Sequence, residues 1–375
     1  MTACDHMPKS GCGSHGVCSA LPDAIAEAAI GLVQSTGYGA PTSVKQLTGG
    51  GNNRIYRIHT GAEALVLKHY FRHQVDQRDR LGNEYAFLSF CTDRGITCIP
   101  RPVGMDAQAG IALYTYVTGE PCAALQDNPP DKALGQEIAE AAAFLAKLHD
   151  ASHHPEAAAL APASEACLKP TDHFECVDRR LQVLEEALSA PLSESMANAC
   201  EFVRNVLRPA WNTQRESALA HIQDEEPARR TLSPSDFGFH NALRTAYGLV
   251  FLDFEYAGWD DPAKTLCDFV CHPAHHLPFS FQSNALLALA EAVTTDTSEK
   301  TVLLERTLHL LPVHVLKWCC IMLNDFKPTD NARRHFAMGG DPEARRAKQL
   351  AKVRAYFSAS LPRLATLSDS IRSQI

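Results

Sequence analysis

Positive charge is scarce in this sequence. Lys and Arg together number 35 against 43 Asp and Glu, which gives a formal net charge of −8. A protein that binds nucleic acid neutralises phosphates with a basic face, so we expect no nucleic-acid partner. The acidic balance is compatible with a cationic substrate, but it does not by itself predict one.

Long apolar runs are absent as well. No run approaches the roughly 18 residues of a membrane-spanning helix, so we expect no membrane partner. The first twenty residues are polar and rich in Gly and Cys, unlike a secretory signal, and the 13 Cys follow no framework spacing. We therefore expect a cytoplasmic protein with reduced thiols. Residues 1–20 are predicted to be a disordered tail. The Cys and His residues in this segment match no compact metal-binding spacing; they are Cys4, His6, Cys12, His15 and Cys18.

The size and composition predict two lobes. The chain has 375 residues, of which 45% are hydrophobic, enough for a large core. A segment rich in Pro, Asp and Asn at 120–131 indicates a boundary, giving an N-lobe at 21–118 and a helical C-lobe at 119–375. Apolar periodicity predicts C-lobe helices, the last of them with a basic face toward solvent, at 134–149, 174–189, 198–210, 283–294, 301–326 and 342–360.

A glycine-rich turn and a lysine strand mark the N-lobe. Three glycines lie between the β-rich segments Val44–Leu47 and Ile55–Ile58. Backbone N–H groups in such a turn can approach phosphates, although a plain hairpin turn explains the pattern as well. The next strand places Lys68 on the same face as Val66, beneath the turn, and Glu84 on the following helix could hold it by an ion pair. An edge-strand Lys and a solvated Glu are the competing interpretations.

The most informative stretch contains Asp236, Asn241 five positions later, and Asp253 after the apolar segment 250–252. In phosphoryl transfer a loop Asp can accept the proton of an attacking hydroxyl. The Asn five residues on and an Asp after the next strand can hold Mg²⁺ on the ATP phosphates. Taken alone, the spacing also fits a surface loop before a hairpin strand, because Asp and Asn are common in turns.

The order of these features resembles the aminoglycoside phosphotransferase and choline kinase family, relatives of the protein kinases. The resemblance covers about residues 44–275 and is most specific at Asp253–Pro262, which reads Asp-Phe-Glu-Tyr-Ala-Gly-Trp-Asp-Asp-Pro. It implies an α+β, bilobal, protein-kinase-like fold. A small N-lobe would carry an antiparallel sheet and a helix, a larger C-lobe would be mainly helical, and ATP with Mg²⁺ would bind between them.

The resemblance also implies a role for each motif residue. Asp236 would be the catalytic base, while Lys68 would hold phosphate oxygens and be held by Glu84. The other implied roles are Mg²⁺ ligation by Asn241 and Asp253, phosphate covering by Gly49, Gly50, Gly51, Asn52 and Asn53, and adenine contact by Thr115, Tyr116 and Val117. Glu255 and Asp260 could suit a cationic substrate, but capping and turn formation are the competing interpretation for both.

Two positions depart from the family pattern. The family usually has His-Gly-Asp at the catalytic loop, where this chain has Pro234-Ser235-Asp236. Proline cannot brace the loop by hydrogen bonding, so we expect Ser233 or His240 to supply support. Thr265 stands where many relatives carry an Asp, and Asp268 is expected to take that structural role.

These features predict an ATP- and Mg²⁺-dependent phosphotransferase that phosphorylates a hydroxyl of a sugar, an aminoglycoside or an amino-alcohol. The alternative is a catalytically inactive nucleotide-binding or scaffold relative. Retention of Lys68, Asp236, Asn241 and Asp253 together favours the enzyme. A protein kinase is disfavoured, because no Ala-Pro-Glu segment follows Asp253.

Overall fold

The structure is a computed structural model that describes residues 21–47, 53–61, 63–73, 78–126, 129–222, 230–275, 277–338 and 341–375. The predicted tail at 1–20 lies outside these residues. So do four of the five residues predicted to cover the phosphates, namely Gly49, Gly50, Gly51 and Asn52.

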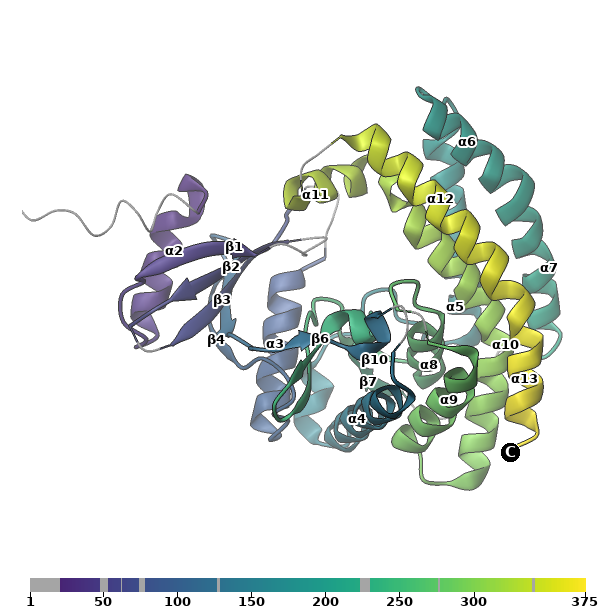
Figure 1. Ribbon diagram of the computed structural model, residues 1–375, viewed down its shortest axis with the longest axis horizontal. Coiled ribbons are helices and arrows are strands. Elements are labelled where there is room, and N and C mark those ends of the chain that lie inside the picture. Colours follow the sequence, from purple (N-terminus) through teal and green to yellow (C-terminus); the bar gives the residue numbers. More distant parts are fainter. Residues whose placement is uncertain are drawn as a thin grey trace, which may run out of the picture.

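The N-terminal part is built on a five-stranded antiparallel sheet with the order β1-β2-β3-β5-β4 (Figure 1). Its strands are β1 (Ser43–Leu47), β2 (Arg54–His59), β3 (Ala64–His69), β4 (Pro102–Asp106) and β5 (Ile111–Thr115). Lys68 on the central β3 lies opposite Ile55 of β2 and Ala112 of β5. The interpretation of Lys68 as an edge-strand residue is therefore wrong.

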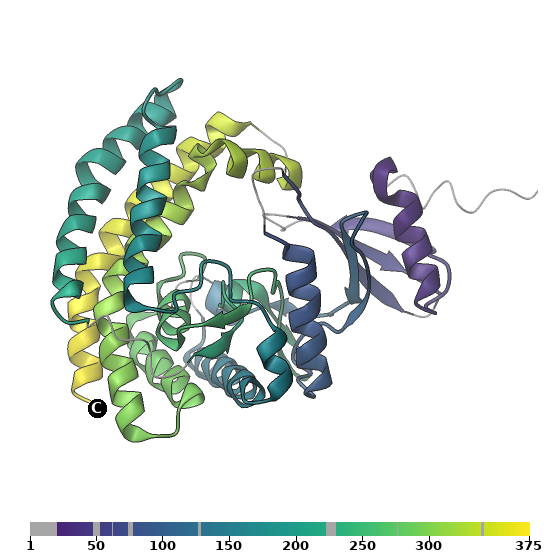
Figure 2. The same cartoon turned by 180° about the vertical axis from the view of Figure 1, so that it is seen from behind.

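Two helices cover this sheet from opposite sides (Figures 1 and 2). Alternation along β3 sends Leu65 and Leu67 into a core shared with α2 (Asp23–Ser35). Lys68 points the other way, toward α3 (Arg80–Asp93), where it meets a side chain of that helix. The alternation of side chains along the strand thus separates an apolar face from the face that carries Lys68.

Helices make up most of the remaining chain: α4 (Asp131–Ser152), α5 (Pro170–Ala187), α6 (Glu194–Phe202), α7 (Arg208–Leu219), α8 (Pro262–Cys271), α9 (Phe279–Val293), α10 (Thr297–Met322), α11 (Pro328–Met338), α12 (Pro342–Ser360) and α13 (Leu364–Arg372). Two small antiparallel sheets lie among them. One joins β6 (Glu120–Pro121), β8 (Ala242–Thr245) and β9 (Gly248–Phe251), and the other joins β7 (Thr231–Ser233) and β10 (Gly258–Asp260). The predicted catalytic stretch connects these short strands.

The helix α10 forms the centre of the helical core, in contact with α5, α7, α8, α9, α12 and α13. Almost all side chains from Val313 to Phe326 are buried, as predicted for that stretch. Among the described residues, Thr297–Phe326 is the one helical segment long and apolar enough to span a membrane, but 83% of its apolar window is buried inside the protein. Burial of this kind is what a core helix shows.

Three details of the predicted helices are corrected. The helix predicted at 198–210 is divided into α6, a wider π-type turn at 203–207, and α7, because Pro209 has no N–H to donate to the preceding turn. Neither α11 nor α13 was predicted. The basic face of α12 is not simply solvated, because Arg345 and Arg346 both donate hydrogen bonds to the buried Asp325.

Candidate active site

Lys68 is the centre of a buried ion-pair network. Its Nζ lies 2.8 Å from each carboxylate oxygen of Glu84 and 2.6 Å from Oδ1 of Asp253. An ammonium has three N–H donors, so these contacts use all of them. The predicted pairing of Lys68 with Glu84 is confirmed, and the network extends to the predicted metal ligand Asp253.

Glu84 is held by more than the lysine. Its carboxylate also accepts hydrogen bonds from the Tyr70 hydroxyl at 2.7 Å and the Phe254 N–H at 3.2 Å, and the residue is 2% exposed. Burial raises the pKa of Glu84, and Lys68 opposes that rise. Burial would lower the pKa of Lys68, but Asp253 and Glu84 raise it well above its usual value, so the ammonium stays charged.

Asn241 and Asp253 lie at the open end of the same hairpin. They flank the hairpin of β8 and β9, in which Ala242 is opposite Phe251, and the Asn241 carbonyl accepts the Leu252 N–H at 2.7 Å. Asp253 has a φ of 65° and a side chain that is 35% exposed. Because oxygen donors suit Mg²⁺, this pair of carboxylate and carboxamide fits a magnesium ion, and the predicted metal role stays a prediction.

The loop that carries Asp236 is strained. Ser235 and Asp236 have φ values of 48° and 37°, and with Asp253 they are three of the four described non-glycine residues with positive φ. Such conformations persist only where the surroundings hold them, and they are concentrated at functional sites. Asn241 contributes by donating from Nδ2 to the Asp236 carbonyl at 3.1 Å.

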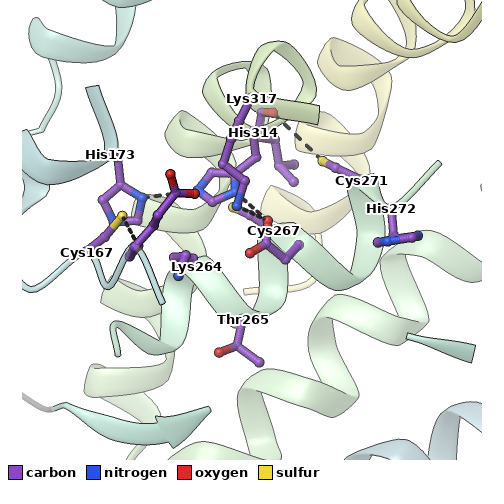
Figure 3. Close-up of polar contacts among 12 residues, drawn as sticks. Cys167, His173, Lys264, Thr265, Cys267, Cys271, His272, His314 and Lys317 are labelled. Carbon is purple, nitrogen blue, oxygen red and sulfur yellow. Dashed lines mark hydrogen bonds and ion pairs between the residues drawn. The ribbon is translucent and has the colours of Figure 1, made fainter. Parts of the chain in front are cut away.

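Ser233 braces this loop, as predicted for a chain that has Pro234 in place of the usual His. The Ser235 N–H donates to the Ser233 hydroxyl at 3.0 Å, and the Thr265 hydroxyl donates to the same oxygen at 2.8 Å. Thr265 lies on α8, and Figure 3 shows it near the start of that helix. The two departures from the family pattern therefore meet in one contact, with Thr265 supporting Ser233.

Two histidines flank the Asp236 carboxylate. Nε2 of His272 is 3.2 Å from Oδ1 of Asp236, and Nε2 of His240 is 3.5 Å from the same oxygen. Burial raises the pKa of Asp236, but these imidazoles outweigh it and hold the pKa well below its usual range. The sequence predicts His240 as a possible donor. It does not predict His272, because no spacing rule connects two residues 36 positions apart.

The helix α8, which carries Thr265 and ends just before His272, is anchored by a buried polar network (Figure 3). Asp268 contacts Nζ of Lys317 and lies 3.0 Å from Nδ1 of His314, whose Nε2 lies 3.0 Å from Nδ1 of His173. Asp268 thus ties α8 to α10, and its substitution for the Asp that many relatives carry at the position of Thr265 stays a prediction.

The predicted substrate residues Glu255 and Asp260 lie in internal networks. Glu255 is 2% exposed and accepts a hydrogen bond from Nδ2 of Asn53 at 2.6 Å, which ties the start of β2 to the helical part. Asp260 is fully buried, where it contacts Lys264 and accepts the Cys167 N–H at 2.8 Å. We therefore correct the substrate interpretation of both residues, since their oxygens serve the fold. The side chain of Asn53, which was predicted to cover the phosphates, is likewise engaged in this contact between the N-terminal sheet and the helical part.

The predicted adenine contacts lie at the end of β5. Thr115 accepts the Arg101 N–H on its hydroxyl at 2.9 Å, and the Tyr116 N–H donates to the Ala64 carbonyl at 3.3 Å. The Tyr116 ring lies 4.1 Å from the Arg57 guanidinium. Thr115 and Tyr116 are thus held in place just before Val117, and contact of these three residues with a nucleotide stays a prediction.

With this geometry in place, the chain can be compared with known proteins. A sequence model of the phosphotransferase enzyme family matches residues 43–301. The match covers more than half of the chain, which therefore belongs to the phosphotransferase enzyme family. A comparison with curated proteins found no match.

Solved structures share the fold. The choline/ethanolamine kinase family protein from Mesorhizobium loti aligns with a TM-score of 0.56 and 19% identity, over 93% of this chain and 99% of that one. A choline kinase from Cryptosporidium parvum Iowa II gives 0.54 and 13%, over 87% and 93%. A spectinomycin phosphotransferase in complex with ADP and spectinomycin gives 0.54 and 12%, over 92% and 98%. The predicted bilobal, protein-kinase-like α+β fold is confirmed, and family and fold together indicate a small-molecule phosphotransferase.

Proposed function

We propose that this protein transfers the γ-phosphoryl group of ATP, with Mg²⁺, to a hydroxyl of a small molecule. The observation that carries the proposal is the Lys68 network, in which one ammonium contacts both Glu84 and Asp253, while the Asn241 carbonyl accepts the N–H of Leu252, the residue before Asp253. A metal ion would supply charge neutralisation at the phosphates, with Asp253 and Asn241 as its ligands.

Each of the other residues has a defined task. Lys68 would contact phosphate oxygens, and because all three of its donors are in use, a phosphate oxygen would take the place now held by Asp253. Glu84 would keep Lys68 on its face of the sheet. Asp236 is held as a carboxylate with a partly exposed side chain, so it can accept a hydrogen bond from the acceptor hydroxyl and orient it for attack.

A cavity beside His272 indicates the class of acceptor. A cavity of about 690 Å³ lies where α8 ends, between α10, α12 and α13, and His272 forms part of its wall. Among the described residues that line it, the charged ones are Lys352 and Arg363, and none is acidic. Since Glu255 and Asp260 are committed elsewhere, these cations favour an acceptor alcohol that carries an anionic group.

A coupled measurement of ADP release tests the proposal. Mg²⁺-ATP would be offered with anionic, neutral and cationic alcohols, including sugars, aminoglycosides and amino-alcohols. We expect acceptor-dependent ADP release, and Asp236→Asn should lower kcat by about 10²–10⁴-fold without weakening nucleotide binding. The exposed Asp369→Asn on α13 is the matched control. Normal turnover by Asp236→Asn would remove the assigned role of that residue.

A second measurement separates the enzyme from an inactive nucleotide-binding relative. Both interpretations predict that Mg²⁺-ATP raises the thermal midpoint of unfolding, and that Asp253→Ala abolishes the Mg²⁺-dependent part of the shift. Only the enzyme releases ADP when an acceptor is added. Thermal stabilisation without ADP release across the whole panel would favour the inactive relative.

A further inference from the structure

The Asp236 carboxylate has a partner from outside its own loop. His272 follows the last residue of α8, 36 positions beyond Asp236, and its Nε2 approaches Oδ1 at 3.2 Å. The residue is 7% exposed. The contact therefore joins the strained catalytic loop to a helix that is anchored in the core.

The hydrogen bond at Nδ1 of His272 shows which of the two ring nitrogens carries the proton. The Ala274 N–H donates to Nδ1 of His272 at 3.1 Å, so Nδ1 accepts and carries no proton. In a neutral imidazole the proton then lies on Nε2, which donates it to Asp236. A backbone amide thus selects the tautomer that the carboxylate requires.

Packing fixes the orientation of the same ring. The His240 imidazole is stacked on it at a centroid distance of 3.7 Å and an interplanar angle of 8°. The Trp318 indole meets it edge-on at 4.2 Å and 72°. A ring held on one side by a parallel face and on another by a perpendicular one has little freedom to turn its donor away from Asp236.

A metal site is the competing interpretation of these histidines. His240, His272 and His275 offer nitrogen atoms that lie within 4.8 Å of one another. Imidazoles bind a metal through lone pairs in the ring plane, and the parallel planes of His240 and His272 do not direct those lone pairs to one point. Both nitrogens of His272 are also occupied by hydrogen bonds.

We propose that His272 is a positioning residue for phosphoryl transfer, holding the Asp236 carboxylate through an Nε2–H hydrogen bond. The inference rests on the proposed function, since it assigns to Asp236 the orientation of the acceptor hydroxyl. His272 acts through Asp236 and not on the reacting atoms. It supplies from α8 a support for the carboxylate that Pro234 cannot give from within the loop.

Two substitutions of His272 separate donation from packing. His272→Gln retains an amide N–H near the position of Nε2, and His272→Phe retains an aromatic ring but has no donor. We expect His272→Phe to lower kcat about 10–100-fold with the KM for ATP unchanged. We expect His272→Gln to recover most of that loss. Equal kcat values for the two variants, or a wild-type kcat in His272→Phe, would overturn the proposal.

The metal interpretation is tested on the same protein preparations. Hydrogen bonding predicts that the purified protein contains no stoichiometric zinc and that Zn²⁺ alone does not raise its thermal midpoint. One equivalent of bound zinc that is lost in His240→Gln would overturn the assignment of His272 as a hydrogen-bond donor.

A measurement that needs no activity separates this inference from the proposed function. The ¹⁵N spectrum of the labelled imidazoles reports the tautomer of each histidine. We expect His272 in the Nε2–H form, with a slowly exchanging proton whose protection is lost in Asp236→Ala. An Nδ1–H form would overturn the inference even in an active enzyme. Absence of ADP release with all acceptors would instead remove the proposed function, while the spectrum still decides whether the contact exists.

Discussion

The two halves of the candidate site are held in different ways. Lys68 is fixed by charge, between two carboxylates in a buried network built on β3 and α3. Asp236 lies on a loop of left-handed residues and takes part in hydrogen bonds with Asn241 and His272, while the Ser233 hydroxyl accepts the N–H of the neighbouring Ser235. The first half is rigid because separating its charges in a dry site is costly. The second half depends on several modest bonds that together offset backbone strain.

The difference affects how each half should respond to mutation. Loss of one charge in the Lys68 network leaves others uncompensated, so both stability and activity should fall. Loss of one hydrogen bond near Asp236 leaves the remaining bonds in place, so the effect should be smaller and should fall mainly on turnover.

The largest effect is expected from Lys68→Met. It leaves the Glu84 and Asp253 carboxylates without their shared cation, so the free energy of unfolding should fall by about 3–5 kcal/mol. Turnover should fall by at least about 10³-fold, because the proposed phosphate contact is lost. Urea unfolding and ADP release measure the two effects, and Lys45→Met on the exposed part of β1 is the control.

The double variant Lys68→Met/Glu84→Gln sharpens this result. Neutralising Glu84 removes the more deeply buried of the two uncompensated charges, so a large part of the lost stability should return while turnover does not. If stability were not regained, the buried charge would not be the cause of the loss.

A smaller effect is expected from Ser233→Ala, which removes the acceptor for both the Ser235 N–H and the Thr265 hydroxyl. The free energy of unfolding should fall by about 1–3 kcal/mol, because buried donors lose their partner. Turnover should fall about tenfold with ATP affinity unchanged. Thr265→Val, which leaves the Ser235 contact intact, should cost less by both measures. The reverse order would show that Thr265 acts otherwise than through Ser233.

The pH dependence of stability tests the anchor of α8. Burial lowers the pKa of His314 to about 3, with Lys317 adding to the effect. Between about pH 6.5 and that value the unfolded state binds the extra proton. Stability should therefore fall as the pH falls from 6.5 to 5, by at most about 1.4 kcal/mol per pH unit from this group.

The variant His314→Gln should reduce that slope, although it also loses stability at pH 7 with its hydrogen bonds. The exposed His153→Gln should leave the slope unchanged. Thermal unfolding at several pH values measures both variants. A slope that is the same in His314→Gln as in the wild type would show that His314 does not carry the effect.

The smallest effect is expected from Ser235→Gly. Glycine adopts the φ of 48° found here without steric cost, but it also increases the entropy of the unfolded chain. The two contributions oppose each other, so the free energy of unfolding should change by less than about 1 kcal/mol. A loss well above that value would mean that the Ser235 side chain supports the loop.

Much of the Lys68 half could be predicted from the sequence. The strand period placed Lys68 on the face away from Leu65 and Leu67, because strand alternation is local. The chemistry of phosphoryl transfer suggested Glu84, on the following helix, as its partner. The position of Asp253 could also be predicted from the sequence, because it comes soon after the apolar strand β9. The structural description does not extend to the glycine turn between Leu47 and Asn53, so its contact with phosphates stays a prediction.

Other features of the site could be recognised only in the tertiary structure. Glu255 and Asp260 were candidates for binding a cation, yet both are committed to buried partners, and a sequence does not show which acidic residues face outward. The support of Asp236 by Thr265 and His272 depends on where α8 packs against the loop. Local periodicity indicated which side chains could take part in chemistry, whereas long-range packing decided which of them meet and how the Asp236 carboxylate is held.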